Sequence, residues 1–219
     1  MHNIRLKMSI RTGILIAIIA MASIVVTSNI LVHFLIGEWL TYAAFTYPFA
    51  FLITDLSNRL YGPRVAKLIV LVGFTTGIIG SLVGTQIIGE FGPLVTLRVA
   101  IASGTAFLLS QLLDVKLFSL LFVQKHWWRA PLLSSLIGGL VDTLIFFSLA
   151  FDSYFIFLEV SNDVSWANVE VPLLGFGFLA PVWISLAVAD FMVKFGVVCI
   201  SLVPFKLLLG RLLLLTEPY

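Results

Sequence analysis

The chain has 219 residues, of which 60% are hydrophobic and only 11% are charged, and its mean hydropathy is +1.12. A soluble domain carries charged side chains at about a quarter of its positions, so this composition leaves too little polar surface to face water. The net charge of +2 comes from basic residues spread between apolar stretches, which excludes the basic patch typical of a nucleic-acid-binding protein.

Sequence motifs for metal binding and ATP hydrolysis are missing. Cys199 is the single cysteine, so the sequence has no disulfide framework and no thiolate metal site. The three histidines lie far apart and form no HExxH motif, and no GxxxxGK[ST] motif is present. We therefore expect no metal, no cofactor and no ATPase activity.

Six apolar stretches are long enough to cross a bilayer as helices. The hydrocarbon core is about 30 Å thick, which takes roughly 20 helical residues. The stretches lack the alternating pattern of barrel strands, and the first is too long for a secretory signal. The sequence predicts an all-α membrane protein, a six-transmembrane-helix bundle forming a single domain over residues 1–219, with helices at 12–36, 41–61, 65–89, 94–113, 130–151 and 178–209.

The connections between these stretches alternate in charge. Lysine and arginine occur before the first helix, after the second, after the fourth and after the sixth, whereas the other three connections contain only acidic charges. By the positive-inside rule, both termini are expected in the cytoplasm. The membrane that the chain crosses is expected to be a bacterial inner membrane. The basic residues are Arg5, Lys7, Arg11, Arg59, Arg64, Lys67, Lys116, Lys125, Arg129, Lys206 and Arg211, and the acidic ones are Glu38, Glu90, Asp152, Glu159, Asp163 and Glu170.

The two halves of the chain share one feature. The middle helix of each three-helix half carries a carboxylate, Asp55 in the first half and Asp142 in the second. Halves of opposite orientation are a common design of carriers, so this pattern allows a 3+3 inverted repeat.

Several polar side chains fall inside the apolar stretches. A charge at the bilayer centre costs about 2.5–3.5 kcal/mol on insertion scales, so each requires a partner or a function. Asp142 has no cation within a helical turn, whereas Asp190 and Lys194 lie four residues apart. The candidate substrate-binding residues are Asn29, Asp55, Arg98, Gln111, Asp142, Trp183, Asp190 and Lys194.

Several candidates also have a structural interpretation. Asp190 and Lys194 can form a self-neutralising i, i+4 pair, and Asp142 can bond to Arg98 or Lys194 on another helix. Arg98 can extend to the interface, and Asn29 can join two helices. Gln111 lies near the cytoplasmic helix end, on a face of its helix roughly opposite that of Arg98, so one pocket cannot readily use both.

Glycines of the third predicted helix follow a different pattern. Gly73, Gly77, Gly80 and Gly84 are spaced by four, three and four residues, so they line one helix face. Such a face predicts close packing, either against another helix of this chain or in a homodimer.

A series of short motifs extends along the chain from the first helix to the last. The motifs are Ser28-Asn29, the Phe-Thr-Tyr-Pro-Phe run ending in Thr54-Asp55, Tyr61-Gly62, Arg98-Val99-Ala100 with Ser103, Gln111-Leu112-Leu113-Asp114-Val115 with Phe118, Trp127-Trp128-Arg129, Gly139 with Asp142-Thr143 and Phe146-Phe147, and Asp190 with Lys194. Together these motifs resemble those of the YhhQ-type queuosine-precursor transporters of the vitamin-uptake family.

This resemblance implies a carrier, not an enzyme, that imports 7-cyano-7-deazaguanine or 7-aminomethyl-7-deazaguanine. Such a base presents two adjacent N–H donors to a carboxylate, a carbonyl to a donor such as lysine, and flat faces to aromatic rings. The connection over residues 152–179 is longer than the family pattern, which leaves open a lid, a re-entrant segment or another substrate.

Four alternatives remain open at this stage. The chain can be the substrate-binding membrane subunit of an ATP-driven vitamin uptake system, or a carrier of another small nucleobase-like solute. An intramembrane enzyme with an Asp142–Asp190 dyad lacks the expected Tyr-Asp or Gly-x-Gly-Asp motif, and a membrane scaffold leaves the intramembrane charges unexplained. The coupling ion is also left open.

Overall fold

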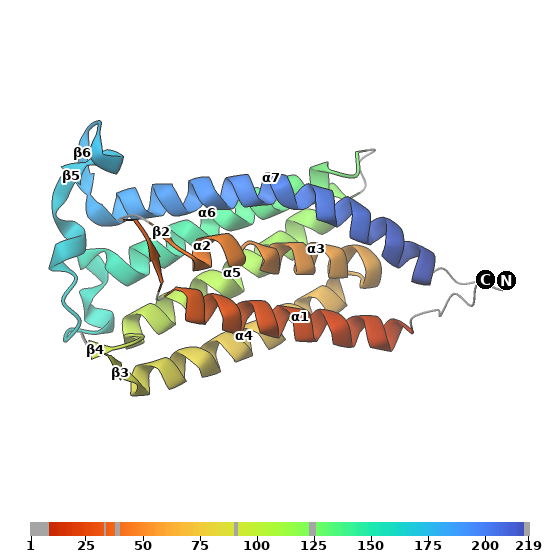
Figure 1. The fold of residues 1–219 in the computed structure, drawn as a ribbon, viewed down its shortest axis with the longest axis horizontal. Coiled ribbons are helices and arrows are strands. Elements are labelled where there is room, and N and C mark those ends of the chain that lie inside the picture. Colours follow the sequence, from red (N-terminus) through yellow and green to blue (C-terminus); the bar gives the residue numbers. More distant parts are fainter. Residues whose placement is uncertain (1–8, 33, 38–39, 90–91, 123–125, 217–219) are drawn as a thin grey trace.

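Long helices run side by side along one axis and are joined by short hairpins in the computed structural model, which describes residues 9–32, 34–37, 40–89, 92–122 and 126–216 (Figure 1). The predicted loop charges Arg5, Lys7, Glu38, Glu90 and Lys125 lie outside the described residues. The helices are α1 (Ile10–Leu31), α2 (Ala43–Thr46), α3 (Phe49–Tyr61), α4 (Pro63–Gln86), α5 (Leu97–Leu121), α6 (Arg129–Phe151) and α7 (Val182–Thr216).

Within the described residues, five helices are long and apolar enough to cross a membrane: α1, α4, α5, α6 and α7. Their outer faces carry large apolar side chains, such as Ile16, Leu71, Leu144 and Ile200, each about half exposed or more. A surface of this kind is stable in lipid and not in water. The chain is therefore an all-α, multi-pass membrane protein.

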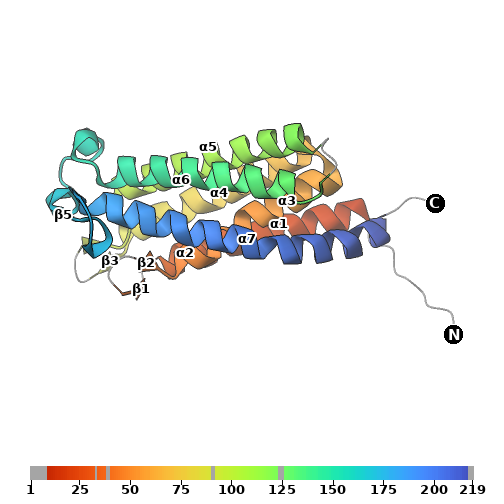
Figure 2. The same cartoon turned by 90° about the horizontal axis from the view of Figure 1, so that it is seen from above.

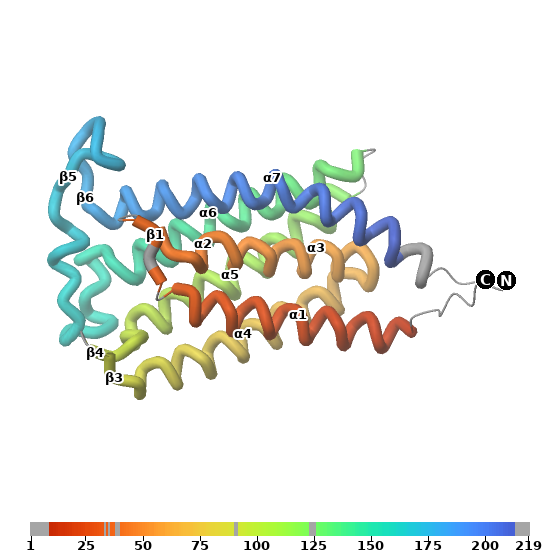
Figure 3. Tube along the Cα trace, viewed as in Figure 1, coloured from red at the N-terminus to blue at the C-terminus, as the bar shows by residue number. Residues whose placement is uncertain are grey.

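The second predicted helix, over residues 41–61, is interrupted, so the expectation of one continuous helix there is wrong. It consists of α2 and α3, which follow one another along the same path and are separated at Tyr47 and Pro48 (Figure 3). Proline has no N–H and clashes with the preceding turn, which breaks the regular helix. Neither piece alone is long enough to span a bilayer.

Other helix boundaries also differ from the predicted ones. α1 ends at Leu31 and not at residue 36, because the chain turns back at Gly37, whose φ of +64° favours glycine. α4 begins and ends slightly earlier than residues 65–89. α5 continues to Leu121, past the predicted end at residue 113, since the buried Asp114 is hydrogen-bonded and so interrupts the apolar pattern without ending the helix.

Three two-stranded hairpins and a long connection lie at one end of the bundle (Figure 1). The connection between α6 and α7 folds into short 3-10 turns and one hairpin, and α7 begins at Val182, not at residue 178. The hairpins are β1 (Leu35–Ile36) with β2 (Leu40–Thr41), β3 (Ile88–Gly89) with β4 (Gly92–Pro93), and β5 (Glu170–Pro172) with β6 (Leu179–Pro181); the 3-10 turns are Ser153–Leu158, Ser165–Asn168 and Leu173–Gly175.

The opposite end of the bundle holds the start of α1, the end of α7 and two helix connections (Figures 1 and 2). α3 passes directly into α4 through Gly62, whose φ of +84° requires glycine, and Pro63 then occupies the first turn of α4. The described basic residues near this end, called the basic end below, are Arg11, Arg59, Arg64, Lys67, Lys116, Arg129, Lys206 and Arg211.

The glycine face of α4 packs against α1 of the same chain. A Cβ atom added at Gly73 would lie 2.8 Å from Met21, and one at Gly80 would lie 3.0 Å from Asn29. Glycine therefore allows α1 and α4 to approach closely. This is the first of the two predicted arrangements, packing against another helix of this chain. A homodimer through this face stays a prediction, and it would require α1 to move away.

Candidate functional site

A cluster of buried charges lies between α6 and α7. The Lys194 Nζ atom is 2.8 Å from Asp142 Oδ2 and 2.5 Å from Asp190 Oδ2. It also donates a hydrogen bond of 3.0 Å to Thr143 Oγ1. The Lys194 and Asp142 side chains are 6% and 5% exposed, so this ion pair is shielded from water. Two carboxylates thus surround a single ammonium group.

Neutral polar groups complete this Lys194 cluster. Thr143 donates a hydrogen bond of 2.8 Å to Asp190 Oδ2, and Ser110 of α5 donates one of 3.3 Å to Asp142 Oδ1. The Tyr47 ring centroid lies 5.9 Å from Lys194 Nζ. The cluster therefore offers hydrogen-bond acceptors, one cationic donor and an aromatic ring within one region of the bundle.

The spacing of these residues explains why they meet. Asp190 and Lys194 lie one turn apart on α7, and Asp142 and Thr143 lie well inside α6. Tyr47 is placed beside them by the break between α2 and α3, and interrupted helices commonly build the binding sites of carriers. We did not predict Tyr47, Thr143 or Ser110 as site residues. The sequence signal from which Tyr47 could have been found is Pro48, which follows it within an apolar stretch.

A second polar cluster lies nearer the basic end. The Ser135 Oγ atom of α6 lies within hydrogen-bond distance of Asp55 Oδ2, at 3.0 Å, and of Asp114 Oδ1, at 3.4 Å, and Ser134 donates a hydrogen bond of 3.3 Å to Asp55 Oδ1. All four side chains are buried. Asp55 comes from α3 and Asp114 from α5, so this pair of carboxyl groups joins three helices.

Gln111 belongs to this second cluster and not to the first. Its Oε1 atom accepts a hydrogen bond of 2.6 Å from Thr54, which precedes Asp55. The Gln111 Nε2 atom and the Asp114 Oδ2 atom are buried and have no partner among the described residues. Asp55 and Gln111 therefore lie together. Their cluster is roughly two turns of α6 away from the Lys194 cluster, because Ser135 contacts the one and Asp142 belongs to the other.

Arg98 lies at the hairpin end, away from both clusters. Its guanidinium donates hydrogen bonds to the backbone oxygens of Leu149, at 2.7 Å, and Asp152. Its backbone N–H donates to Glu159 Oε2 at 2.8 Å, and nearby Asn162 donates to Thr96 Oγ1 at 3.1 Å. These contacts hold the long connection against the start of α5, which favours a structural role for Arg98.

The remaining predicted site residues lie toward the edges of the site. Asn29 is half-buried and lines a cavity of about 30 Å³ that Tyr47 and Ser103 also line. Trp183 lies in the first turn of α7, eleven residues or about 16 Å before Lys194 along the helix. The structure therefore brings Asp142, Asp190 and Lys194 together, and it places Asn29 near them through Tyr47.

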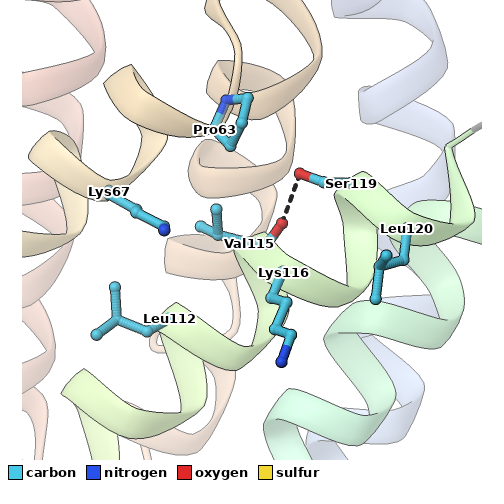
Figure 4. Close-up of a pocket in the computed structure, with 7 residues that line it drawn as sticks. All are labelled: Pro63, Lys67, Leu112, Val115, Lys116, Ser119 and Leu120. Atoms are coloured by element: carbon cyan, nitrogen blue, oxygen red, sulfur yellow. Dashed lines mark hydrogen bonds between the residues drawn. The ribbon is translucent and has the colours of Figure 1, made fainter.

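A groove between two helices is separate from these clusters. It has a volume of about 450 Å³, lies between α4 and α5 near the basic end, and is lined mainly by apolar side chains with the exposed Lys67 and Lys116 (Figure 4). None of the buried charged residues lines it. Because a polar solute requires converging polar groups, the Lys194 cluster is the stronger candidate site.

Comparison with known proteins supports a transport role. The family model described as "Putative vitamin uptake transporter" matches residues 41–209. A "Queuosine precursor transporter" of Escherichia coli is 32% identical over 204 residues, which cover 87% of this chain and 81% of that protein. A "Probable queuosine precursor transporter" of Haemophilus influenzae is 33% identical over 174 residues, covering 75% of this chain and 66% of that protein.

No solved structure matches the chain. The family match covers α2 through most of α7, and it therefore includes both buried clusters and the helix break at Tyr47. The intramembrane charges, the multi-pass fold and the two relatives agree on one class of protein. The chain belongs to the vitamin uptake transporter family and is a transporter, not an enzyme.

Proposed function

We propose that this chain is a secondary carrier that imports queuosine precursors, 7-cyano-7-deazaguanine or 7-aminomethyl-7-deazaguanine, across a bacterial inner membrane. The names of the two relatives support this substrate class. The observation that carries the proposal is the buried Lys194 cluster beside the helix break. Intramembrane ionisable groups of this kind typically mark a substrate or ion pathway.

The cluster matches the chemistry of a deazaguanine. A carboxylate such as Asp142 accepts hydrogen bonds from the ring N–H and the exocyclic amine together, and Lys194 donates to the carbonyl. The Tyr47 ring, which packs edge-to-face against Phe107 at 5.9 Å between centroids, offers a flat surface for stacking. The substrate then replaces part of the Lys194 ion pair without leaving an unpaired charge.

Binding requires the helices around Tyr47 to separate. The adjoining cavity of about 30 Å³ holds roughly one water molecule, which is far too small for a purine-sized base. Asn29 of α1 and Ser103 of α5 line the same cavity. We therefore place the substrate path between α1, α4 and α5, with the Lys194 cluster at its inner end.

The proposed membrane arrangement has six spans, with α2 and α3 together forming the second. Both termini lie in the cytoplasm, the basic end faces inward, and the hairpins and the long connection lie outside. A 3+3 inverted repeat would relate the first three spans to the last three, with Asp55 and Asp142 on the middle span of each half.

Reporter fusions test this arrangement. A fusion after Arg211 and one in the Arg59–Lys67 segment are expected to report a cytoplasmic location, because these segments carry the basic residues. A fusion near Asp163 is expected to report an external location. An external signal after Arg211 would mean that the α2–α3 segment does not cross the membrane.

The transport activity is tested by uptake of labelled deazaguanines in cells unable to make queuosine. We expect accumulation of the label only in cells that express the chain, with unlabelled deazaguanine as competitor and guanine as the specificity control. An equal rate in cells with and without the chain would contradict the proposed function. Equal competition by guanine would indicate a carrier of another nucleobase-like solute.

A further inference from the structure

The second cluster, formed by Asp55, Asp114, Ser134 and Ser135, has no part in the substrate path proposed above. Along α6, Ser135 lies seven residues, or roughly 10 Å, nearer the basic end than Asp142. Ser110 on α5 connects the two regions, since it donates to Asp142 and lies one turn before Asp114. The two clusters therefore share the same pair of packed helices.

The charges of the second cluster are not balanced. Asp55 and Asp114 are 2% and 0% exposed, and in the part of the chain that the structure describes no ion pair reaches either of them. A buried carboxylate without a counter-charge is strongly disfavoured. The cations of neighbouring helices are engaged elsewhere: Arg59 with the Phe122 ring at 3.8 Å, Arg129 with Trp128 at 5.7 Å, Lys206 with Trp127 at 5.1 Å, and Lys67 and Lys116 at the exposed groove.

The hydrogen bonds between Ser135 and the two carboxyl groups indicate that this cluster lacks one proton. Ser135 has one hydroxyl hydrogen and lies within bonding distance of both Asp55 and Asp114, so it cannot donate to both at once. Whichever of Asp55 Oδ2 and Asp114 Oδ1 the serine does not serve is left without this donor, and a proton bound by the pair would supply one.

Gln111 provides an independent observation. It is fully buried, and its oxygen is held by Thr54, while its Nε2 donor has no partner. One turn along α5, the Asp114 Oδ2 acceptor also has no partner. A free donor and a free acceptor in adjacent buried positions match a site that changes its hydrogen bonds when a proton arrives or leaves.

The helices next to the pair are closely packed. A Cβ atom at Gly138 would already lie 2.8 Å from the Phe51 ring and 3.4 Å from Asp114 Cβ. Sodium or another cation would need several oxygen ligands and space between them. A proton adds charge without adding volume.

We propose that the Asp55–Asp114 pair binds one proton and couples its inward movement to that of the substrate. The proton adds to a carboxylate oxygen, which gives one carboxylic acid and one carboxylate that share a hydrogen bond. Release to water at the basic end restores two carboxylates, which Ser134, Ser135 and the Gln111 amide then stabilise as donors. This inference rests on the proposed transport function and makes the carrier a proton symporter.

The test uses the purified full-length protein in lightly buffered lipid vesicles that contain a pH-sensitive dye. Adding 7-cyano-7-deazaguanine outside is expected to acidify the interior of vesicles with the wild-type protein. For Asp55→Asn and Asp114→Asn, we expect acidification at the level of empty vesicles, while exchange of labelled for unlabelled substrate persists. Asp163→Asn, on the exposed outer connection, serves as the matched control and is expected to behave as wild type.

The outcomes separate the two proposals. Absence of substrate exchange by the wild-type protein would overturn the transport function itself. Exchange without acidification, or uptake driven by a sodium gradient, would overturn proton coupling alone, as would normal acidification by both Asn variants. If an Asn variant fails to insert, Asp114→Glu provides a second test, because it keeps a titratable group and is expected to retain proton movement.

Discussion

Replacing Asp142 by asparagine is expected to abolish uptake while leaving the protein in the membrane. The substitution keeps one acceptor but turns the other into a donor that faces the N–H groups of the base. Lys194 remains neutralised by Asp190, whose Oδ2 atom is 2.5 Å from its Nζ atom, so folding survives. The measurement is uptake of labelled deazaguanine, normalised to membrane abundance.

Lys194→Gln provides the informative comparison for this variant. It leaves Asp142 and Asp190 without their shared cation, and breaking a buried ion pair from one side costs about 3–5 kcal/mol. We therefore expect loss of both abundance and uptake for Lys194→Gln, but loss of uptake alone for Asp142→Asn. Asp163→Asn is the control for the chemical change. Wild-type uptake by Asp142→Asn would remove Asp142 from the site.

A second large effect is expected for Gly138→Ala, this time on stability. The new methyl group would lie 2.8 Å from the Phe51 ring and 3.4 Å from the Ser110 backbone oxygen. Phe51 is 1% exposed and its ring cannot bend away, so α5, α6 and α3 must separate. Overpacking of this kind costs about 1–3 kcal/mol. The measurement is the midpoint of thermal unfolding of the purified protein, with membrane abundance as a second readout.

The neighbouring residue gives a matched control for this variant. A Cβ atom at Gly139 would lie 4.0 Å from Lys194, which is ordinary van der Waals contact. Gly139→Ala is therefore expected to leave the unfolding midpoint close to that of wild type. Combining Gly138→Ala with Phe51→Leu should recover part of the lost stability, because the smaller side chain yields space. Equal midpoints for Gly138→Ala and Gly139→Ala would contradict the packing described for this contact.

The sequence alone predicts the membrane class and most helices, because length and hydropathy report directly on burial in lipid. It does not predict the break at Tyr47 and Pro48, since a proline within an apolar stretch is compatible with both a kinked and an interrupted helix. It also places the end of the fourth predicted helix too early. Asp114 interrupts the apolar pattern there, but the hydroxyl group that makes this buried carboxyl group tolerable comes from Ser135 on α6.

The arrangement of the candidate site follows only in part from the sequence, for a similar reason. Asp190 and Lys194 lie on one helix, so their i, i+4 spacing already indicates that they meet. Whether Asp142 bonds to Arg98 or to Lys194 depends on which helices are neighbours. In the structure, Lys194 donates a hydrogen bond to Asp142. Arg98 instead donates hydrogen bonds to backbone oxygens at the hairpin end. Every residue has a backbone oxygen, so a sequence pattern does not predict this type of partner.

We propose that the Lys194 cluster binds the substrate and does not serve the structure alone. Binding of labelled 7-cyano-7-deazaguanine to the purified variant Asp142→Asn/Asp190→Asn/Lys194→Gln tests it most directly, because this variant removes all three charges and strands none of them. We expect the triple variant to regain the membrane abundance that Lys194→Gln loses, and to show no binding. Binding at wild-type affinity by the triple variant would contradict the claim and assign the cluster to structure.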